Sequence, residues 1–193
     1  FGLNFPHKSH LLQQKIQCDV CHSNIRKHGE FVATKQSCAV CHHQDTAKDC
    51  SGCHQIQKTL YQGGSLDGYE IPKDIMSDAE AECTDCHLGP QNKIFRSDQN
   101  KCLDCHEEGY DEIFVEWQNS VKELILSVKA DLQKKRKFVL SDSGKAQLLK
   151  IERMLQIFEL DGSHGIHNFS FIEETLTNLS KTLKNLSENS PDE

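Results

Sequence analysis

The chain has 193 residues, enough for one or two domains, and a formal net charge of −7 at pH 7. This negative charge argues against nucleic acid as a partner and favours redox partner proteins that present basic docking patches. No apolar run reaches about 18 residues, so the sequence predicts no membrane-spanning helix.

Apolar residues are few and unevenly distributed. Only 36% of the residues are hydrophobic and 7% are aromatic, and the first hundred lie mostly in short polar stretches. Such a segment buries too little apolar surface to offset the conformational entropy that folding removes. We therefore expect residues 1–109 to depend on an apolar group that the polypeptide does not supply.

Five copies of the string CxxCH contain all ten cysteines. In this string the two cysteines form thioethers with a c-type haem, and the histidine takes one axial position on the iron. The sequence thus predicts five covalently bound haem c groups. The cysteine pairs are Cys18 and Cys21, Cys38 and Cys41, Cys50 and Cys53, Cys83 and Cys86, and Cys102 and Cys105, followed by His22, His42, His54, His87 and His106.

Zinc and disulfides are the competing interpretations of these cysteines. A zinc ribbon uses two CxxC pairs but requires no histidine directly after the second cysteine. A disulfide framework requires only an even number of cysteines. Five identical copies with no cysteine left over favour haem.

Each haem iron has a second axial position, and the remaining histidines are the candidates for it. Eleven histidines minus five motif histidines leaves six, one more than full bis-histidine ligation needs. Met76 and Met154 are alternative ligands, although Met154 also fits simple packing in a helix. The six distal candidates are His7, His10, His28, His43, His164 and His167.

The motifs divide the chain into three parts. Residues 1–60 form a predicted three-haem module, and residues 61–82, rich in glycine and aspartate, a connecting loop. Residues 83–193 combine two haem motifs with a C-terminal helical hairpin or bundle.

Amphipathic helices begin after residue 110. A stripe from Phe114 to Leu132 predicts a helix over 111–135, and the SDSG string at 141–144 precedes a second helix over 145–160. Ser170 and Glu173 form a predicted capping box at the start of a third, leucine-rich helix. The predicted fold class is mostly α with extensive loop: a multihaem cytochrome c with a haem-packed N-terminal region and antiparallel C-terminal helices.

The N-terminal string FPHKSH, with CDVCH and CAVCHH, resembles the class III multihaem cytochromes and their three-haem c7 relatives over about residues 5–54. The resemblance implies that His7 ligates the first haem and His10 the third, with His28 or His43 for the second. The chain departs from that family because no histidine follows His22.

The C-terminal part resembles the tail of the pentahaem cytochrome c nitrite reductase superfamily over about residues 83–186. The resemblance rests on CLDCH, Trp117 in a long helix and the string GIHN at 165–168. It implies that His167, together with His164, supplies ligands to the fourth and fifth haems. The substrate-binding CxxCK motif of those reductases does not occur in this sequence.

These observations predict an electron-transfer protein rather than an enzyme. The alternative is a subunit of a larger respiratory complex, an oligomer or an extracellular conductive assembly. A reductase of small oxyanions is less favoured, because it needs an open iron and its anionic substrates would be repelled. Haem attachment of this type and a start at Phe1, from which we expect a removed secretion signal, predict a periplasmic or extracellular bacterial or archaeal protein.

Overall fold

The computed structural model describes residues 7–8, 11–12, 16–22, 33, 50, 54–90, 94–138 and 141–186. The chain divides into two compact units, one of residues 1–48 with 89–94 and one of residues 49–88 with 95–193. The predicted division at residues 60 and 82 stays a prediction. In the first unit the described element is a short 3-10 helix, η2 (Cys18–Val20), which buries none of its residues.

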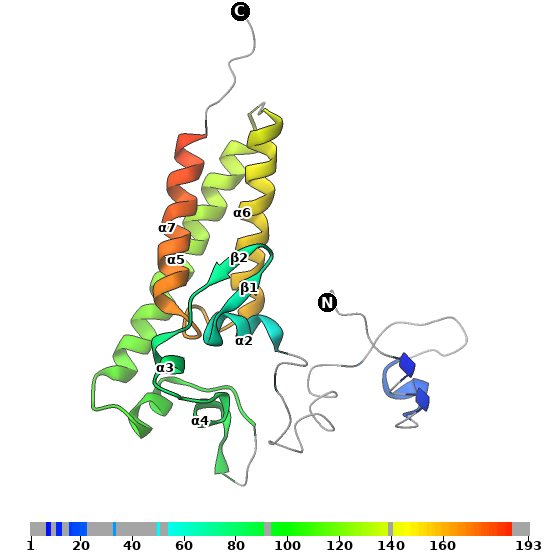
Figure 1. Ribbon diagram of the computed structural model, residues 1–193, viewed down its shortest axis with the longest axis vertical. Helices are drawn as coiled ribbons and strands as arrows, with labels where there is room; N and C mark the ends of the chain where they lie inside the picture. Colours follow the sequence, from blue (N-terminus) through cyan, green and yellow to red (C-terminus); the bar gives the residue numbers. More distant parts are fainter. Residues whose placement is uncertain are drawn as a thin grey trace, which may run out of the picture. The chain divides into compact units, whose positions relative to one another are not determined.

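Three long helices form most of the second unit (Figure 1). They are α5 (Tyr110–Lys135), α6 (Asp142–Asp161) and α7 (Phe169–Asn185). Helices α5 and α7 pack against one another, and ion pairs join α5 to α6. The predicted helices over 111–135 and 145–160, and the mostly helical fold class, are therefore confirmed.

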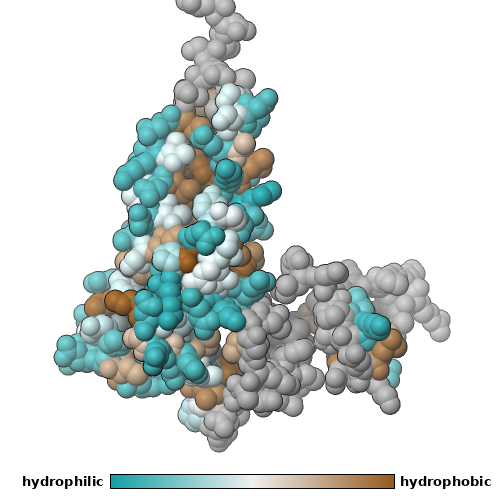
Figure 2. Space-filling model, viewed as in Figure 1, coloured by the Kyte–Doolittle hydropathy of each residue, from teal (hydrophilic) through white to brown (hydrophobic). Residues whose placement is uncertain are grey.

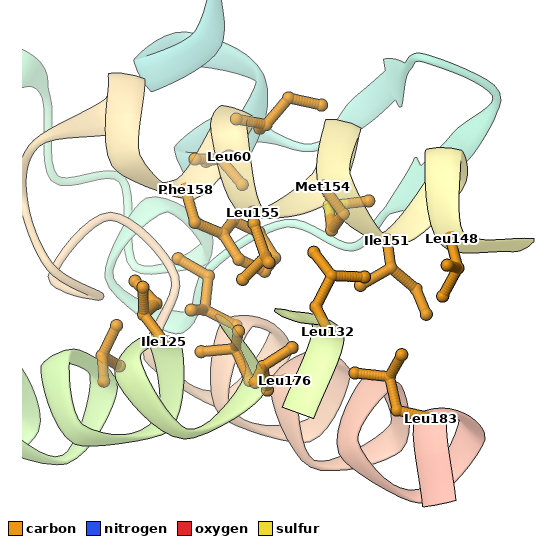
Figure 3. Close-up of a cluster of buried hydrophobic side chains, with 14 of the residues drawn as sticks. Leu60, Ile125, Leu132, Leu148, Ile151, Met154, Leu155, Phe158, Leu176 and Leu183 are labelled. Carbon is orange, nitrogen blue, oxygen red and sulfur yellow. The ribbon is translucent and has the colours of Figure 1, made fainter. Parts of the chain in front are cut away.

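The apolar stripes of these helices meet in one core (Figure 3). Val121, Met154 and Leu176 are completely buried, so Met154 takes the packing role rather than that of a haem ligand. Leu60 and Ile71 also enter this core, although they belong to the part of the chain for which the sequence predicts no core of its own. Burial of one such side chain stabilises the folded state by roughly 1.5–3 kcal/mol. Leu60 and Ile71 therefore anchor the segment that precedes α5 to the helices.

Polar residues define the helix ends. The Ser141 hydroxyl accepts a hydrogen bond from the Gly144 amide and caps α6, as the SDSG string predicts. Helix α7 begins earlier than predicted, because the Asn168 side chain is its cap and accepts from the Phe171 amide. The predicted Ser170–Glu173 capping box is therefore wrong, since Ser170 already lies inside the helix.

Residues 61–82, for which the sequence predicts a connecting loop, contain regular structure. After α2 (Gln55–Gln62), strands β1 (Gly64–Leu66) and β2 (Tyr69–Ile71) pair antiparallel with Leu66 opposite Tyr69. Asp67 and Gly68 both have positive φ and form the two-residue turn between the strands. The short helix α3 (Ile75–Asp78) follows, capped by the Asp74 carboxylate. Met76, the second candidate methionine, lies in α3.

The face of the helices shown in Figure 2 is predominantly hydrophilic. Exposed apolar side chains include Leu126 on α5 and Leu149 on α6. Within the described ranges, no helix combines the length and the apolar character needed to cross a membrane.

Candidate functional site

The first, fourth and fifth CxxCH motifs, which the structure describes in full, each contain helical structure. The fourth motif is itself a helix, α4 (Cys83–His87), and the fifth lies at the end of the 3-10 helix η6 (Gln99–Asp104). In the first, third and fifth motifs the histidine amide donates to the carbonyl of the first cysteine at 2.9 Å. Residues three and four apart share one face of such a turn, so the two cysteines and the histidine of a motif lie side by side.

The cysteines of the first motif lie at the two ends of one such turn. Cys21 directly follows η2, and its amide donates to the Cys18 carbonyl at 3.2 Å. Cys18 is exposed and Cys21 is half-buried. The attachment role of Cys21 and Cys18 stays a prediction. The same holds for the other described cysteines: Cys50, Cys83, Cys86, Cys102 and Cys105.

Two pairs of histidines each combine one motif histidine with one distal candidate. The ring centres of His87 and His167 lie 6.1 Å apart, with the ring planes inclined by 49°. In the first unit the rings of His7 and His22 are nearly parallel, with their centres 6.4 Å apart. The structure thus brings together two of the pairs to which the family resemblances point.

This spacing fits two imidazoles bound to opposite sides of one iron. A metal–nitrogen bond of about 2 Å on each side, with each ring centre lying behind its nitrogen, places the centres roughly 6 Å apart. The ring-centre separations of both pairs match this spacing, so the residues present at the first and fourth motifs are compatible with a bis-histidine haem.

Hydrogen bonds select the nitrogen that each imidazole of the second pair offers to iron. His87 Nδ1 donates to the Phe95 carbonyl at 3.1 Å, and His167 Nδ1 bonds to Asp161 Oδ1 at 2.5 Å. In both rings Nε2 is therefore the nitrogen that can bind a metal. Burial lowers the pKa of His87, the neighbouring His167 lowers it further, and the bond to Phe95 opposes them. The net shift favours the neutral imidazole that ligation requires.

His167 lies in the α6–α7 loop, which we define as residues 162–168. Two residues hold this loop against the rest of the unit. Gly165 has a φ of +104°, and a Cβ atom at this position would lie 2.7 Å from Val121 of α5, so only glycine fits without a shift. The Asn168 side chain, 3% exposed, donates to the carbonyls of Leu60 and Pro72. Asn168 thereby ties the start of α7 to α2 and to the residue that follows the hairpin.

Side chains from three other segments bind the backbone carbonyls around the end of α6. Gln57 of α2 donates to the carbonyls of Leu160 and Asp161, both at 3.1 Å. Arg96 donates to the Gly162 carbonyl at 2.8 Å, and Gln118 of α5 to the Ser163 carbonyl at 2.9 Å. The last carbonyls of a helix have no partner within it, so these bonds both satisfy them and fix the loop that carries His167.

Described cysteines of the third and fifth motifs affect the pKa values of the cysteines in the fourth. Burial raises the pKa of Cys83, and Cys50 of the third motif raises it further. Burial likewise raises the pKa of Cys86, with Cys102 and Cys105 of the fifth motif adding to the effect. These cysteines are therefore within electrostatic reach of the fourth motif.

Tyr61 closes the fourth site on another side. Its ring meets that of His167 edge-on, with the centres 6.4 Å apart, and its hydroxyl donates to the Ala81 carbonyl. Burial raises the pKa of this hydroxyl well above its usual range, and the nearby Cys86 raises it further. Tyr61 therefore lines the site as an uncharged side chain.

The fifth motif and His164 are arranged differently. The His106 ring stacks on Tyr110 at the start of α5, with the centres 4.2 Å apart. His164 has a φ of 55°, and burial lowers its pKa, with Lys122 and Arg96 lowering it further. In the part of the chain that the structure describes, no motif histidine forms a ring pair with His164 comparable to that of His87 with His167.

Several predicted site residues lie outside the described residues. They are Cys38, Cys41, His42, Cys53 and the distal candidates His10, His28 and His43. Their roles stay predictions.

Four residues around His167 have no motif that singles them out in the sequence: Tyr61, Asp161, Ser163 and Asn168. For Asn168 a usable signal exists, because an asparagine directly before an amphipathic stripe is a typical helix cap. The other three are recognisable only once the fold brings them to the histidine.

Comparison with known proteins identifies a structural neighbour. No family model matches the chain, and no curated protein matches it. The crystal structure of the outer cell wall cytochrome OcwA is similar to it, with a TM-score of 0.55 and 23% sequence identity. The chain therefore shares its fold with this cytochrome over the matched part. The match covers 86% of this chain but 39% of the OcwA chain, so the chain corresponds to a part of that protein. The narrower resemblances to class III cytochromes and to the nitrite reductase superfamily stay predictions.

Proposed function

We propose that the protein is a pentahaem c-type cytochrome that carries electrons between redox partner proteins. The observation that carries this proposal is the pair His87 and His167, 6.1 Å apart beside the attachment cysteines of the fourth motif. A site built from a CxxCH turn and an opposed, hydrogen-bonded imidazole suits an iron with both axial positions filled.

The chemistry of the function belongs to the cofactor: bound haem supplies an iron that changes reversibly between the ferric and ferrous states. The residues of the chain supply rigidity around it. Phe95 and Asp161 each hold one imidazole, while Gly165 and Asn168 keep the α6–α7 loop in place. A rigid pair of neutral ligands changes little between the two oxidation states, which favours transfer of electrons over binding of a substrate.

The arrangement of the last three motifs supports transfer along the chain. Cys83 is close enough to Cys50, and Cys86 to Cys102 and Cys105, to interact electrostatically, so the fourth attachment site has the third and the fifth in its vicinity. Sequence order alone does not determine such proximity in space. This proximity supports passage of electrons among neighbouring sites.

We place the protein outside the cytoplasm, in the periplasm or at the cell exterior. CxxCH haem attachment and a structural neighbour described as an outer cell wall cytochrome both support this location. The net charge of −7 supports partners with basic docking patches.

The second candidate is a role as part of a larger electron-transfer assembly. The observation in its favour is that the chain matches 39% of a longer cytochrome. Light scattering at high protein concentration distinguishes the candidates, because a monomer contradicts self-assembly.

The proposal is tested on the mature, haem-loaded protein. We expect a mass above that of the 21.9 kDa polypeptide by five haems, and only low-spin ferric haem in the electron paramagnetic resonance (EPR) spectrum of the oxidised protein. A mass equal to that of the bare polypeptide contradicts haem attachment. A substantial high-spin signal contradicts the purely conductive role and favours catalysis at an open iron.

A further inference from the structure

The side chain of Asp161 has no exposed surface. Its carboxylate is hydrogen-bonded by two residues of the α6–α7 loop, Ser163 and His167. Its Oδ1 binds His167 Nδ1 at 2.5 Å. Its Oδ2 accepts from the Ser163 amide at 3.1 Å and from the Ser163 hydroxyl. Burial of a carboxylate is costly unless such partners compensate, so this arrangement requires a reason.

The directions of these bonds indicate that Asp161 acts as an ionised acceptor. The Ser163 oxygen accepts the His167 amide at 3.3 Å, so its own hydrogen is left to donate to Asp161. If His167 binds iron through Nε2, its Nδ1 carries the proton and donates to Oδ1, so both carboxylate oxygens receive donors, which is the pattern of the ionised form.

The two imidazoles of the fourth site are thus held by unlike acceptors. His87 donates to a neutral carbonyl, whereas His167 donates to a charged carboxylate. Charge-assisted bonds are shorter and about twice as strong as neutral ones. A carboxylate on the far nitrogen draws on the Nδ1 proton and makes Nε2 a stronger electron donor to a metal.

We propose that Asp161 is a positioning residue that fixes His167 with Nε2 toward the iron and lowers the reduction potential of the fourth haem. This inference rests on the proposed ligation of that haem by His87 and His167. A stronger donor and a nearby negative charge both stabilise ferric iron, so both effects have the same sign.

Ser163 modulates this effect with the opposite sign. Its hydroxyl and amide donate to Asp161 and withdraw part of the charge that the carboxylate presents to His167. Removing the hydroxyl leaves the amide bond in place and makes the carboxylate a stronger acceptor for the His167 proton.

The test is Asp161→Asn in the haem-loaded protein, followed by a redox titration monitored by EPR. The amide oxygen of asparagine can still accept from His167, so all five haems are expected to stay low-spin. We expect one midpoint to rise by at least the equivalent of a tenfold change in equilibrium constant, 59 mV for one electron. Five unchanged midpoints overturn the inference.

The matched control is Glu159→Gln. Glu159 lies on the same helix, carries the same charge and is 47% exposed in an ion pair with Lys129. We expect no midpoint shift for this variant, because solvent screens its charge and it does not contact the histidine. Equal midpoint shifts for both variants overturn the inference, because the shift would then come from the loss of one negative charge and not from the hydrogen bond to His167.

Ser163→Ala keeps the test decisive if Asp161→Asn does not accumulate. We expect the same midpoint to move downward, because Asp161 loses one competing donor. A shift upward or no shift contradicts the proposed role of the carboxylate.

His167→Ala separates this inference from the function on which it rests. If His167→Ala produces one high-spin haem while Asp161→Asn leaves all midpoints unchanged, ligation stands and the tuning role of Asp161 fails. If His167→Ala leaves all five haems low-spin, the ligand assignment fails and the inference with it.

Discussion

The first and fourth motifs present nearly the same distance between paired imidazoles in very different surroundings. The pair His7 and His22 adjoins η2, a turn without buried residues, and His7 is exposed. The pair His87 and His167 is held by a carbonyl, a carboxylate and a loop packed against α5. The comparison teaches that nearly the same separation of two imidazoles can occur beside an exposed turn and within a packed, hydrogen-bonded site.

The largest expected difference appears when haem is removed. In a chain with all motif cysteines replaced by alanine, we expect residues before 50 to be rapidly cleaved in limited proteolysis. Helices α5–α7 are expected to stay protected, because their own side chains form the buried core. Equal protection of both regions in mass spectrometry of the fragments contradicts this contrast.

Replacing one distal histidine in each pair sharpens the comparison. We expect His7→Ala and His167→Ala each to convert one haem from low to high spin in the oxidised protein, because each removes one axial ligand. Their double variant is expected to show two high-spin haems. If the double variant shows only one, the two histidines do not serve separate irons.

The core of the second unit is tested by Phe158→Ala. Phe158 is 1% exposed, so its truncation leaves a cavity, and we expect the free energy of unfolding in urea to fall by about 3–5 kcal/mol. The control is Leu160→Ala on the same helix, where 57% exposure predicts a change within about 0.5 kcal/mol. Similar losses for both variants contradict the assignment of the core.

A smaller effect is expected for Asn168→Ala. The change removes the donors to the buried Leu60 carbonyl and to the partly buried Pro72 carbonyl, together with the cap of α7, and we expect the free energy of unfolding in urea to fall by roughly 2–3 kcal/mol. Asn178→Ala at an exposed position of α7 serves as the control and is expected to cost less than about 0.5 kcal/mol. A loss no larger than that of the control contradicts the role of Asn168 as a clamp.

The parts of the fold predictable from sequence are those governed by local periodicity. The stripe that includes Val121 and Leu132 is enough to predict α5, and Ser141 is enough to predict the start of α6. The hairpin has a local signal too, the Asp67–Gly68 pair, but glycine-rich and aspartate-rich segments are equally typical of loops. The α7 start is mispredicted because two polar residues, Asn168 and Ser170, compete for one cap.

In the candidate site, too, some residues are predictable from the sequence and others are not. Motif histidines follow from the CxxCH string, and the candidacy of His167 follows from a family resemblance. Asp161 and Tyr61 do not follow, because a single aspartate or tyrosine has no spacing rule relative to a histidine. Only packing of α2 and the end of α6 around the loop brings them to the imidazole.

The carbonyls at residues 160–163 are a shared joint for several parts of the second unit. Gln57, three residues after the third motif, and Arg96, between the fourth and fifth, both bind there, as does Gln118 of α5. One helix end is therefore bonded to segments that flank the last three CxxCH motifs. If these motifs carry haem as proposed, a stiff helix end would limit fluctuations in the distances among those three haems and so keep the transfer rates among them uniform.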